Sequence, residues 1–181
     1  LPQPEVSKLS MSLGEALQQR RSQREYSNQE ISLQTLSTLL WAACGVSDPA
    51  TGKITAASAI NMQDVKIYVS SQTGVCLYNA KANTLTKVSD KDLCEAIAGR
   101  QDFAKSAPIS LVLVSTKDND RAPNDKFGAM DSGYVSQDIY LACTALGLKT
   151  VARATMDFDT LKRELNLADT SYLELNHPIG Y

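Results

Sequence analysis

The run from Ile109 to Val114 constrains the fold more than any other stretch of the sequence, because Ser110 is its only polar residue. A strand with one wet face alternates apolar and polar side chains, whereas a strand covered on both faces is apolar throughout. A helix is also expected from Asp131 to Leu146, and its apolar side chains surround most of its circumference. The chain is therefore expected to fold around one fully covered strand and one buried core helix.

The remaining elements do not alternate as they would in a regular βαβ fold. Ser12 and Glu15 form a capping-box pattern that predicts a first helix ending near Arg24, and a second helix is expected between Ser32 and Gly45. The further elements predicted are a hairpin at 65–69 and 75–78, a short strand within 80–86, a short helix within 89–98, a helix after Asp157 and a last strand at 172–179. This order indicates an α+β fold.

The composition indicates one ordinary globular domain. The chain has 181 residues, of which 43% are hydrophobic and 21% charged, and no linker divides it. We therefore expect an extended N-terminal arm at 1–11 and a single domain at 12–181. Lys and Arg number 18 against 20 Asp and Glu, so the net charge of −2 offers no general basic face for nucleic acid. No apolar run approaches the roughly 20 residues of a membrane span.

Two stretches lack a periodic pattern. Leu1 to Pro4 is an extended, helix-incompatible start of the kind that can follow a removed export signal, although a shortened chain would look the same. This pattern leaves the location open between export and the cytoplasm. The segment from Lys117 to Gly128 is rich in Asp and Asn, and it is expected to be a loop and a candidate lid over a binding site.

Three arginines lie close together where the first helix is expected to end. Helical spacing from Ala16 places Arg20 and Arg24 on the line of the apolar face, so that they should point inward. A buried guanidinium needs a partner, because desolvating an unpaired charge is costly. Either acidic side chains of the chain meet Arg20, Arg21 and Arg24, or a bound anion such as phosphate does, with Ser22 adding a neutral hydrogen bond. A solvated, Arg-rich helix end is the alternative.

A second polar segment, from Ala57 to Gln63, combines small and amide side chains and is expected either to line a recess or to be a plain loop. The chain has no Walker loop, no GxGxxG or GxSxG motif and no HExxH motif. The four cysteines lack metal-site spacing, and the single histidine, His177, is expected to have no catalytic role. An anion site without an obvious nucleophile or base favours a cofactor that brings its own reactivity.

Four segments together resemble the FMN-dependent nitroreductase family, in the family's order. Arg20 to Tyr26 resembles its R-R-S-x-R-x-F/Y opening, and Leu39 to Gly45 resembles its L-L-W-A-A-x-G helix end. Ala57 to Gln63 resembles its P-S-A-x-N-x-Q segment, and Asp131 to Gly147 resembles its D-x-G-x-x-x-Q-N-x-x-L-A-A-x-x-L-G-L helix. The resemblance covers most of the chain and is closest to the compact, SagB-type branch.

The resemblance implies a central mixed sheet surrounded by helices, assembled as an intertwined homodimer with FMN at the interface. It implies ping-pong transfer of hydride from NAD(P)H through the flavin to a nitroaromatic, quinone or similar acceptor, with no catalytic side chain required. The residues implied to bind the cofactor are Arg20, Arg21, Ser22 and Arg24 around the phosphate, ribityl chain and pyrimidine edge; Ser58, Ala59, Asn61 and Gln63 from the partner subunit at the flavin ring; and Val151, Ala152 and Arg153 near its reactive nitrogen.

The sequence departs from the family pattern at several positions. Ala57 stands where proline is usual, Asp138 where asparagine is usual, and the stretch from Val151 to Ala154 lacks a common Glu-Gly pair. C-terminal basic residues that often bind the phosphate do not follow the last strand, and Arg153 is the candidate to compensate. The alternatives to a nitroreductase are a SagB-type FMN dehydrogenase that oxidises azolines in a modified peptide, and a flavin-binding protein without turnover.

Overall fold

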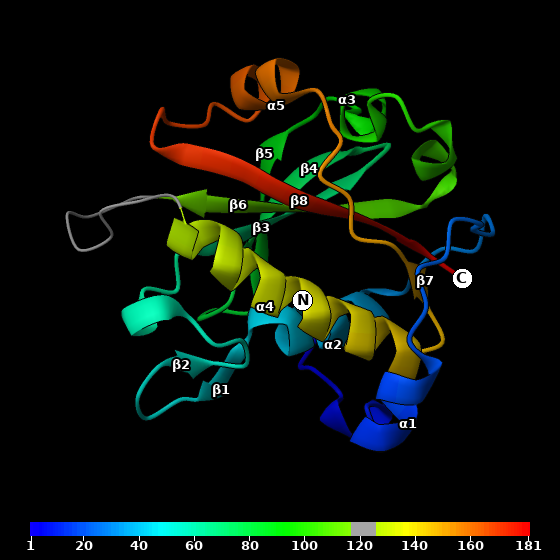
Figure 1. Cartoon of the computed structure of the whole chain (residues 1–181), viewed down its shortest axis with the longest axis vertical. Coiled ribbons are helices and arrows are strands. Elements are labelled where there is room, and N and C mark those ends of the chain that lie inside the picture. The colour runs from blue at the N-terminus through cyan, green and yellow to red at the C-terminus, as the bar shows by residue number, and fades with distance from the viewer. Residues whose placement is uncertain (117–125) are drawn as a thin grey trace.

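A six-stranded sheet forms the centre of the computed structural model, which describes residues 1–116 and 126–181 (Figure 1). The strand order is β5-β4-β3-β6-β8-β7, and β1 and β2 form a separate two-stranded sheet. The strands are β1 (Val46–Asp48), β2 (Lys53–Ile54), β3 (Val65–Ser71), β4 (Gly74–Asn79), β5 (Thr84–Ser89), β6 (Ile109–Thr116), β7 (Lys149–Thr150) and β8 (Ser171–Gly180). The helices are α1 (Leu13–Gln19), α2 (Leu33–Cys44), α3 (Cys94–Ala98), α4 (Lys126–Ala145) and α5 (Phe158–Glu164), with 3-10 turns η1 (Val6–Lys8), η2 (Ala59–Asn61) and η3 (Asp102–Ser106).

The fold is α+β, as the sequence predicts, but the sheet is not mixed within the described residues. Each pairing between its strands is antiparallel, including the long pairing of β6 with β8. Between these two strands the chain travels the length of the sheet twice, once in α4 and once in the segment that leads to α5 (Figure 1). The start of β8 therefore lies beside the end of β6, so the two strands run in opposite directions.

Helices cover both faces of the sheet, and the side chains of β6 alternate between two cores. Leu111 and Leu113 belong to the core that contains α2 and α4, whereas Val112 and Val114 belong to the core that contains α3 and α5. All four side chains are at most 1% exposed. Because successive residues of a strand point to opposite faces, this alternation confirms the prediction of a central strand covered on both sides.

The first helix begins as predicted but ends earlier. Ser12 and Glu15 form the capping box, yet α1 ends at Gln19 and Arg20 is already extended. The backbone N–H of Gln23 then donates to the carbonyl of Thr150, at 2.9 Å, instead of continuing the helix. The prediction that Arg20 and Arg24 lie on one helical face is therefore wrong, because pairing with a distant strand competes with the local helix.

The helix α4 is longer than predicted and is not buried all round. It begins at Lys126 rather than Asp131, and Met130 and Tyr134 are 45% and 47% exposed. Its other side packs on the sheet through residues such as Val135 and Ile139. The side chains of Met130 and Tyr134 therefore lie on the outer side of α4, the helix at the front of Figure 1.

Other expectations are resolved only in part. The candidate lid lies mostly outside the described residues, and its last positions, 126–128, belong to α4. Within the described ranges no helix is both long and apolar enough to span a bilayer. All four cysteines are free, and Cys44 and Cys143 are buried, where desolvation raises the pKa of each thiol.

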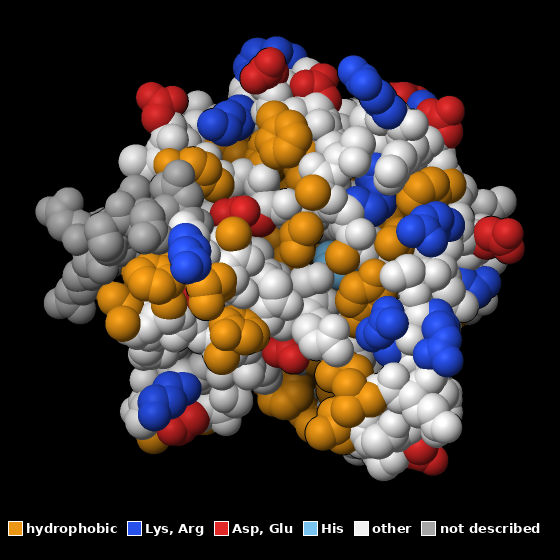
Figure 2. Space-filling view, viewed as in Figure 1, with side chains coloured by type: hydrophobic (Ala, Val, Ile, Leu, Met, Phe, Trp, Pro, Cys, Tyr) orange, Lys and Arg blue, Asp and Glu red, His pale blue; other side chains and the backbone are white. Residues whose placement is uncertain are grey.

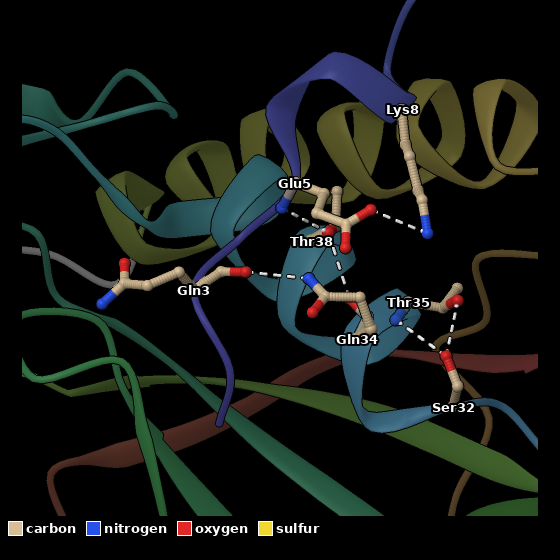
Figure 3. Close-up of polar contacts among 7 residues, drawn as sticks. All are labelled: Gln3, Glu5, Lys8, Ser32, Gln34, Thr35 and Thr38. Atoms are coloured by element: carbon tan, nitrogen blue, oxygen red, sulfur yellow. Dashed lines mark hydrogen bonds and ion pairs between the residues drawn. The ribbon is translucent and has the colours of Figure 1, made fainter.

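The N-terminal arm lies against α2 (Figure 3). The side-chain amide of Gln34 donates to the Gln3 carbonyl at 2.8 Å, and the Glu5 backbone N–H donates to the Thr38 hydroxyl at 3.0 Å. Glu5 also pairs with Lys8 across the 3-10 turn, at 2.7 Å. These bonds satisfy backbone groups that an extended segment would otherwise leave to water, so the arm is tied to the domain that follows it.

Candidate functional site

Tyr140 on α4 joins two of the segments that the sequence assigns to the site. Its hydroxyl oxygen accepts the backbone N–H of Ala152 at 2.8 Å and lies 2.8 Å from the hydroxyl of Ser22. The guanidinium carbon of Arg20 lies 5.0 Å from the centre of the Tyr140 ring, within the range of a cation–π contact. The structure therefore brings the arginine segment 20–24 beside the backbone at 151–153.

The arginine segment is open to the outside rather than buried. Arg20 is half-buried, whereas Arg21 and Arg24 are exposed. Arg24 lies over the ring of Phe103 at 5.9 Å, and Arg21 donates to the carbonyls of Gln18 and Arg20 near the end of α1. Figure 2 shows basic side chains gathered over the chain that leaves α1.

The predicted charge compensation by acidic side chains is not found for these arginines in the part of the chain that the structure describes. Ring faces contact Arg20 and Arg24, and a ring face uses none of the N–H donors of a guanidinium. Those donors are therefore oriented by aromatic neighbours and remain able to bind an anion from outside.

Arg153 has a different environment, because its side chain is only 5% exposed. It donates to the side-chain oxygens of Gln101 and Asn176, both at 2.7 Å, and to the carbonyls of Ala98, at 2.6 Å, and Ile97, at 3.2 Å. The two carbonyls lie at the C-terminal end of α3, where the helix dipole places partial negative charge. Burial lowers the pKa of Arg153, and it has neutral acceptors instead of a carboxylate.

These four bonds make Arg153 a clamp between α3 and β8. The hypothesis that its guanidinium replaces a missing phosphate ligand therefore finds no support in this geometry. The backbone around it does belong to the candidate site: Val151 is buried, the Ala152 N–H points to Tyr140, and the backbone of Arg153 pairs with Asn176 on β8.

The amide-rich segment is a strained turn anchored to Asp131, which is 1% exposed. The carboxylate of Asp131 accepts the Ser58 hydroxyl at 2.8 Å and the Ala59 backbone N–H at 2.9 Å. The side-chain amide of Gln63 donates to the Asn61 side-chain oxygen at 3.1 Å and to the carbonyl of Gly52 at 3.0 Å. The side chains of Ser58 and Gln63 thus hold the turn together.

The tip of this turn projects outward. Ile60, Asn61 and Gln63 all have positive φ, near +50°, which is unusual for residues other than glycine and most costly for a β-branched residue such as Ile60. Ile60 is 67% exposed, and Asn61 is also exposed. Within one chain, therefore, the segment forms a protruding turn, which is nearer to the loop alternative than to a recess.

The two halves of the predicted site lie at different positions along α4. Asp131 anchors the turn and Tyr140 anchors the arginine segment. Nine residues separate them in the sequence, which corresponds to about 14 Å along a helix axis. A ligand that met both segments of one chain would have to span about this distance.

His177 is completely buried between α4 and β7. Its Nε2 lies 2.8 Å from the Ser136 hydroxyl and its Nδ1 lies 3.1 Å from the Thr150 hydroxyl, which itself donates to the carbonyl of Pro178. Because Thr150 has only one proton to give, Nδ1 is the protonated nitrogen and Nε2 the acceptor. Burial lowers the pKa of His177 to about 3.

Comparisons with known proteins identify the family. A model of the nitroreductase family matches residues 17–181, which is most of the chain. This chain belongs to the nitroreductase family. A Methanocaldococcus jannaschii protein provisionally named a nitroreductase is 30% identical over 98% of this chain and 93% of its own length. The family assignment makes the protein an oxidoreductase.

Solved nitroreductase-like structures share the fold. A Ralstonia eutropha JMP134 protein provisionally named a nitroreductase has a TM-score of 0.86 at 30% identity, covering 94% of this chain and 82% of its own. The Escherichia coli microcin synthetase complex McbBCD, with a truncated precursor bound, contains a chain with a TM-score of 0.77 at 16% identity, with coverage of 92% and 72%. An FMN-dependent nitroreductase of Clostridium difficile R20291 has a TM-score of 0.64 at 23% identity, with coverage of 92% and 85%.

Two residues of this nitroreductase site were not singled out from the sequence. Asp131 was treated as the start of a helix, although a buried carboxylate must be supplied with donors. Tyr140 lies among the apolar residues of α4 and does not stand out by periodicity. Its hydroxyl is the feature that could have identified it, because a phenol in a core helix needs a hydrogen-bond partner.

Replacing Asp131 with asparagine is expected to lower the free energy of unfolding by about 2 kcal/mol, because hydrogen bonds to a charged acceptor contribute about 1.5–3 kcal/mol. The variant loses the charge that attracts the Ser58 hydroxyl and the Ala59 N–H. Urea denaturation measures the change. Ser58→Ala removes one donor to Asp131 and also the acceptor of the Gln63 backbone N–H at 2.8 Å, so it should destabilise the same turn. Equal stability of Asp131→Asn and the natural protein would contradict the anchoring role.

The pKa of His177 predicts a loss of stability in acid. The folded protein holds the neutral ring down to about pH 3, whereas the unfolded chain takes up a proton near the ordinary pKa of about 6.5. His177 therefore favours the folded state fully above about pH 6.5, and this contribution falls by up to about 1.4 kcal/mol per pH unit below it. The free energy of unfolding is measured for the natural protein and for His177→Gln between pH 7 and 5. The difference between the two proteins should shrink as the pH falls. A difference that does not change with pH would contradict the lowered pKa of His177.

Proposed function

We propose that this protein is an FMN-dependent oxidoreductase that accepts hydride from NAD(P)H and passes the electrons to a nitroaromatic, quinone or similar acceptor. The observation that carries the proposal is the arginine segment, whose guanidiniums are oriented by Tyr140 and Phe103 and have no carboxylate partner among the described residues. An anion with several acceptor oxygens, such as the phosphate of FMN, fits these donors. Family membership and the FMN-dependent Clostridium difficile neighbour support the choice of cofactor.

Each segment of the site would have a separate task in holding FMN. Arg20, Arg21 and Arg24 would neutralise the phosphate, with Ser22 adding a hydrogen bond to the cofactor. The backbone of 151–153 would border the ring. When bound, FMN supplies the two-electron chemistry; the chain binds it, orients it and keeps water from its reactive side.

A homodimer is part of the proposal, because the turn of one chain would meet the arginine segment of the other. Ser58, Ala59, Asn61 and Gln63 of the partner subunit would then border the ring, with the strained tip at Ile60 beside it. Apolar side chains are available to form such an interface: Leu13, Leu17, Met130 and Tyr134 are 45–66% exposed. Figure 2 shows apolar side chains along this face, some of them around a hollow between α1 and α4.

A second enzymatic function is favoured by one observation, the similarity of the fold to a chain of the microcin synthetase complex. In that case the electron donor would be an azoline in a modified peptide instead of NAD(P)H. A flavin-binding protein without turnover is the remaining alternative.

Purified protein distinguishes these functions. The proposal predicts yellow protein whose absorbance near 450 nm bleaches anaerobically with NADH or NADPH, in roughly one equivalent per bound flavin, and recovers when a nitroaromatic or quinone is added. Bleaching by an azoline-containing peptide but not by either nucleotide would support the dehydrogenase. A bound flavin that no donor bleaches would leave only the binding role.

A further inference from the structure

We infer that Tyr140 is a positioning residue that fixes the direction of the hydrogen bond at Ser22, so that the Ser22 hydroxyl proton points to an acceptor oxygen of the bound ligand. The inference rests on the proposed function, because the ligand is taken to be FMN. The argument starts from the hydrogen-bonding capacity of the phenol. It has one proton to donate and lone pairs to accept with.

The backbone N–H of Ala152 uses the accepting capacity of Tyr140, because an amide N–H can only donate. In the contact between Tyr140 and Ser22, at 2.8 Å, either hydroxyl could be the donor. If Ser22 donated, Tyr140 would accept twice and its own proton would have no acceptor among its described contacts. If Tyr140 donates, the full capacity of the phenol is used. Accepting the Ala152 N–H also polarises the phenol and strengthens its donation.

Two contacts hold the phenol ring in place. The Arg20 guanidinium lies over one face of the ring, and His177 meets the ring edge-on, with centroids 5.4 Å apart and an interplanar angle of 80°. His177 is itself held through both ring nitrogens by Ser136 and Thr150. Because His177 is fixed and Arg20 covers one ring face, the hydroxyl of Tyr140 keeps its place between Ser22 and Ala152.

The consequence lies at Ser22, which is exposed. Its oxygen accepts from Tyr140, so its own proton is available to an acceptor oxygen of the ligand, at a place where Tyr140 also contacts the Arg20 guanidinium. Ser22 therefore keeps its proton for a phosphate or carbonyl oxygen of the ligand, because the Tyr140 proton already occupies one of its two lone pairs. In FMN, Ser22 would donate to a phosphate oxygen or to a carbonyl of the pyrimidine edge.

The test is a double-mutant cycle on cofactor affinity. FMN binding is measured by quenching of flavin fluorescence for the natural protein, Tyr140→Phe, Ser22→Ala and the double variant. Tyr140→Phe keeps the ring, so the contacts with Arg20 and His177 remain. Each single variant should weaken FMN binding about tenfold, the scale of one hydrogen bond, and the double variant should bind no worse than about tenfold, because both changes remove the same interaction.

Controls separate positioning from a loss of structure. Tyr172→Phe removes a hydroxyl from β8, at a position with no role in the proposed site or interface, and should leave the affinity unchanged. Riboflavin, which lacks the phosphate, identifies the oxygen that Ser22 meets: weakened riboflavin binding in both variants indicates a carbonyl, and weakened FMN binding alone indicates the phosphate. Natural affinity in Tyr140→Phe, or additive losses in the double variant, would overturn the inference. If the natural protein itself bound no FMN, the proposed function would fail instead.

Discussion

Replacing Arg153 with leucine is expected to lower the free energy of unfolding by about 3–5 kcal/mol, the cost of removing one partner from a buried, charge-assisted network. The variant leaves the Ile97 carbonyl and the Asn176 side-chain oxygen without a donor among the described residues, and the Ala98 carbonyl keeps only the Gln101 N–H. Proteins are stabilised by only about 5–15 kcal/mol in total, so this loss is a large fraction of the whole. Urea denaturation followed by circular dichroism measures it.

Two further variants sharpen this result. Arg153→Lys should recover only part of the stability, because one ammonium group cannot reach acceptors that a planar guanidinium fork bridges. Arg163→Leu, at an exposed position on α5, should change stability by no more than about 0.5 kcal/mol. If Arg153→Leu kept its stability but lost FMN affinity, the clamp assignment would be wrong and the role of Arg153 as a phosphate ligand would be restored.

The double substitution Arg20→Gln and Arg24→Gln is expected to weaken FMN binding by at least about 100-fold. A hydrogen bond to a charged group contributes about 1.5–3 kcal/mol, which corresponds to about 10- to 150-fold for each arginine. Both side chains contact aromatic rings and project from an extended segment, so glutamine should leave the fold intact. Titration of the apoprotein with FMN, at two salt concentrations, measures the effect and its electrostatic origin.

The matched control is Arg163→Gln, which removes an exposed arginine far along the chain and should bind FMN as tightly as the natural protein. Unfolding curves of all variants show whether the loss is confined to binding. Natural FMN affinity in the double variant would mean that the segment is only a solvated stretch of chain, which is the alternative that the sequence leaves open.

The parts of the fold that local chemistry determines could be predicted from the sequence. Ser32 caps α2, and Gly45 ends it, as their preferences indicate. The apolar run in β6 likewise predicts burial on both faces, and the structure confirms it. The end of α1 could not be predicted, because it depends on the bond from Gln23 to Thr150, which is remote in the sequence.

The site divides in the same way. The motif at 20–24 predicts an anion-binding segment by residue type alone. The position of Arg153 depends on acceptors from α3 and β8, which no local pattern links to it, so its burial could not be inferred. Tyr140 could not be recognised as the residue that joins Ser22 to Ala152, because helical periodicity marks a side as inward without saying which groups it meets.

The central claim is that the arginine segment and the turn of a second chain together hold FMN. Sedimentation of the purified protein during FMN titration, with absorbance recorded at 280 and about 450 nm, tests it most directly. The account predicts a dimer that carries one FMN for each chain. The claim would be contradicted if the protein sedimented as a monomer and no FMN absorbance moved with it, even at flavin concentrations on the order of 100 μM.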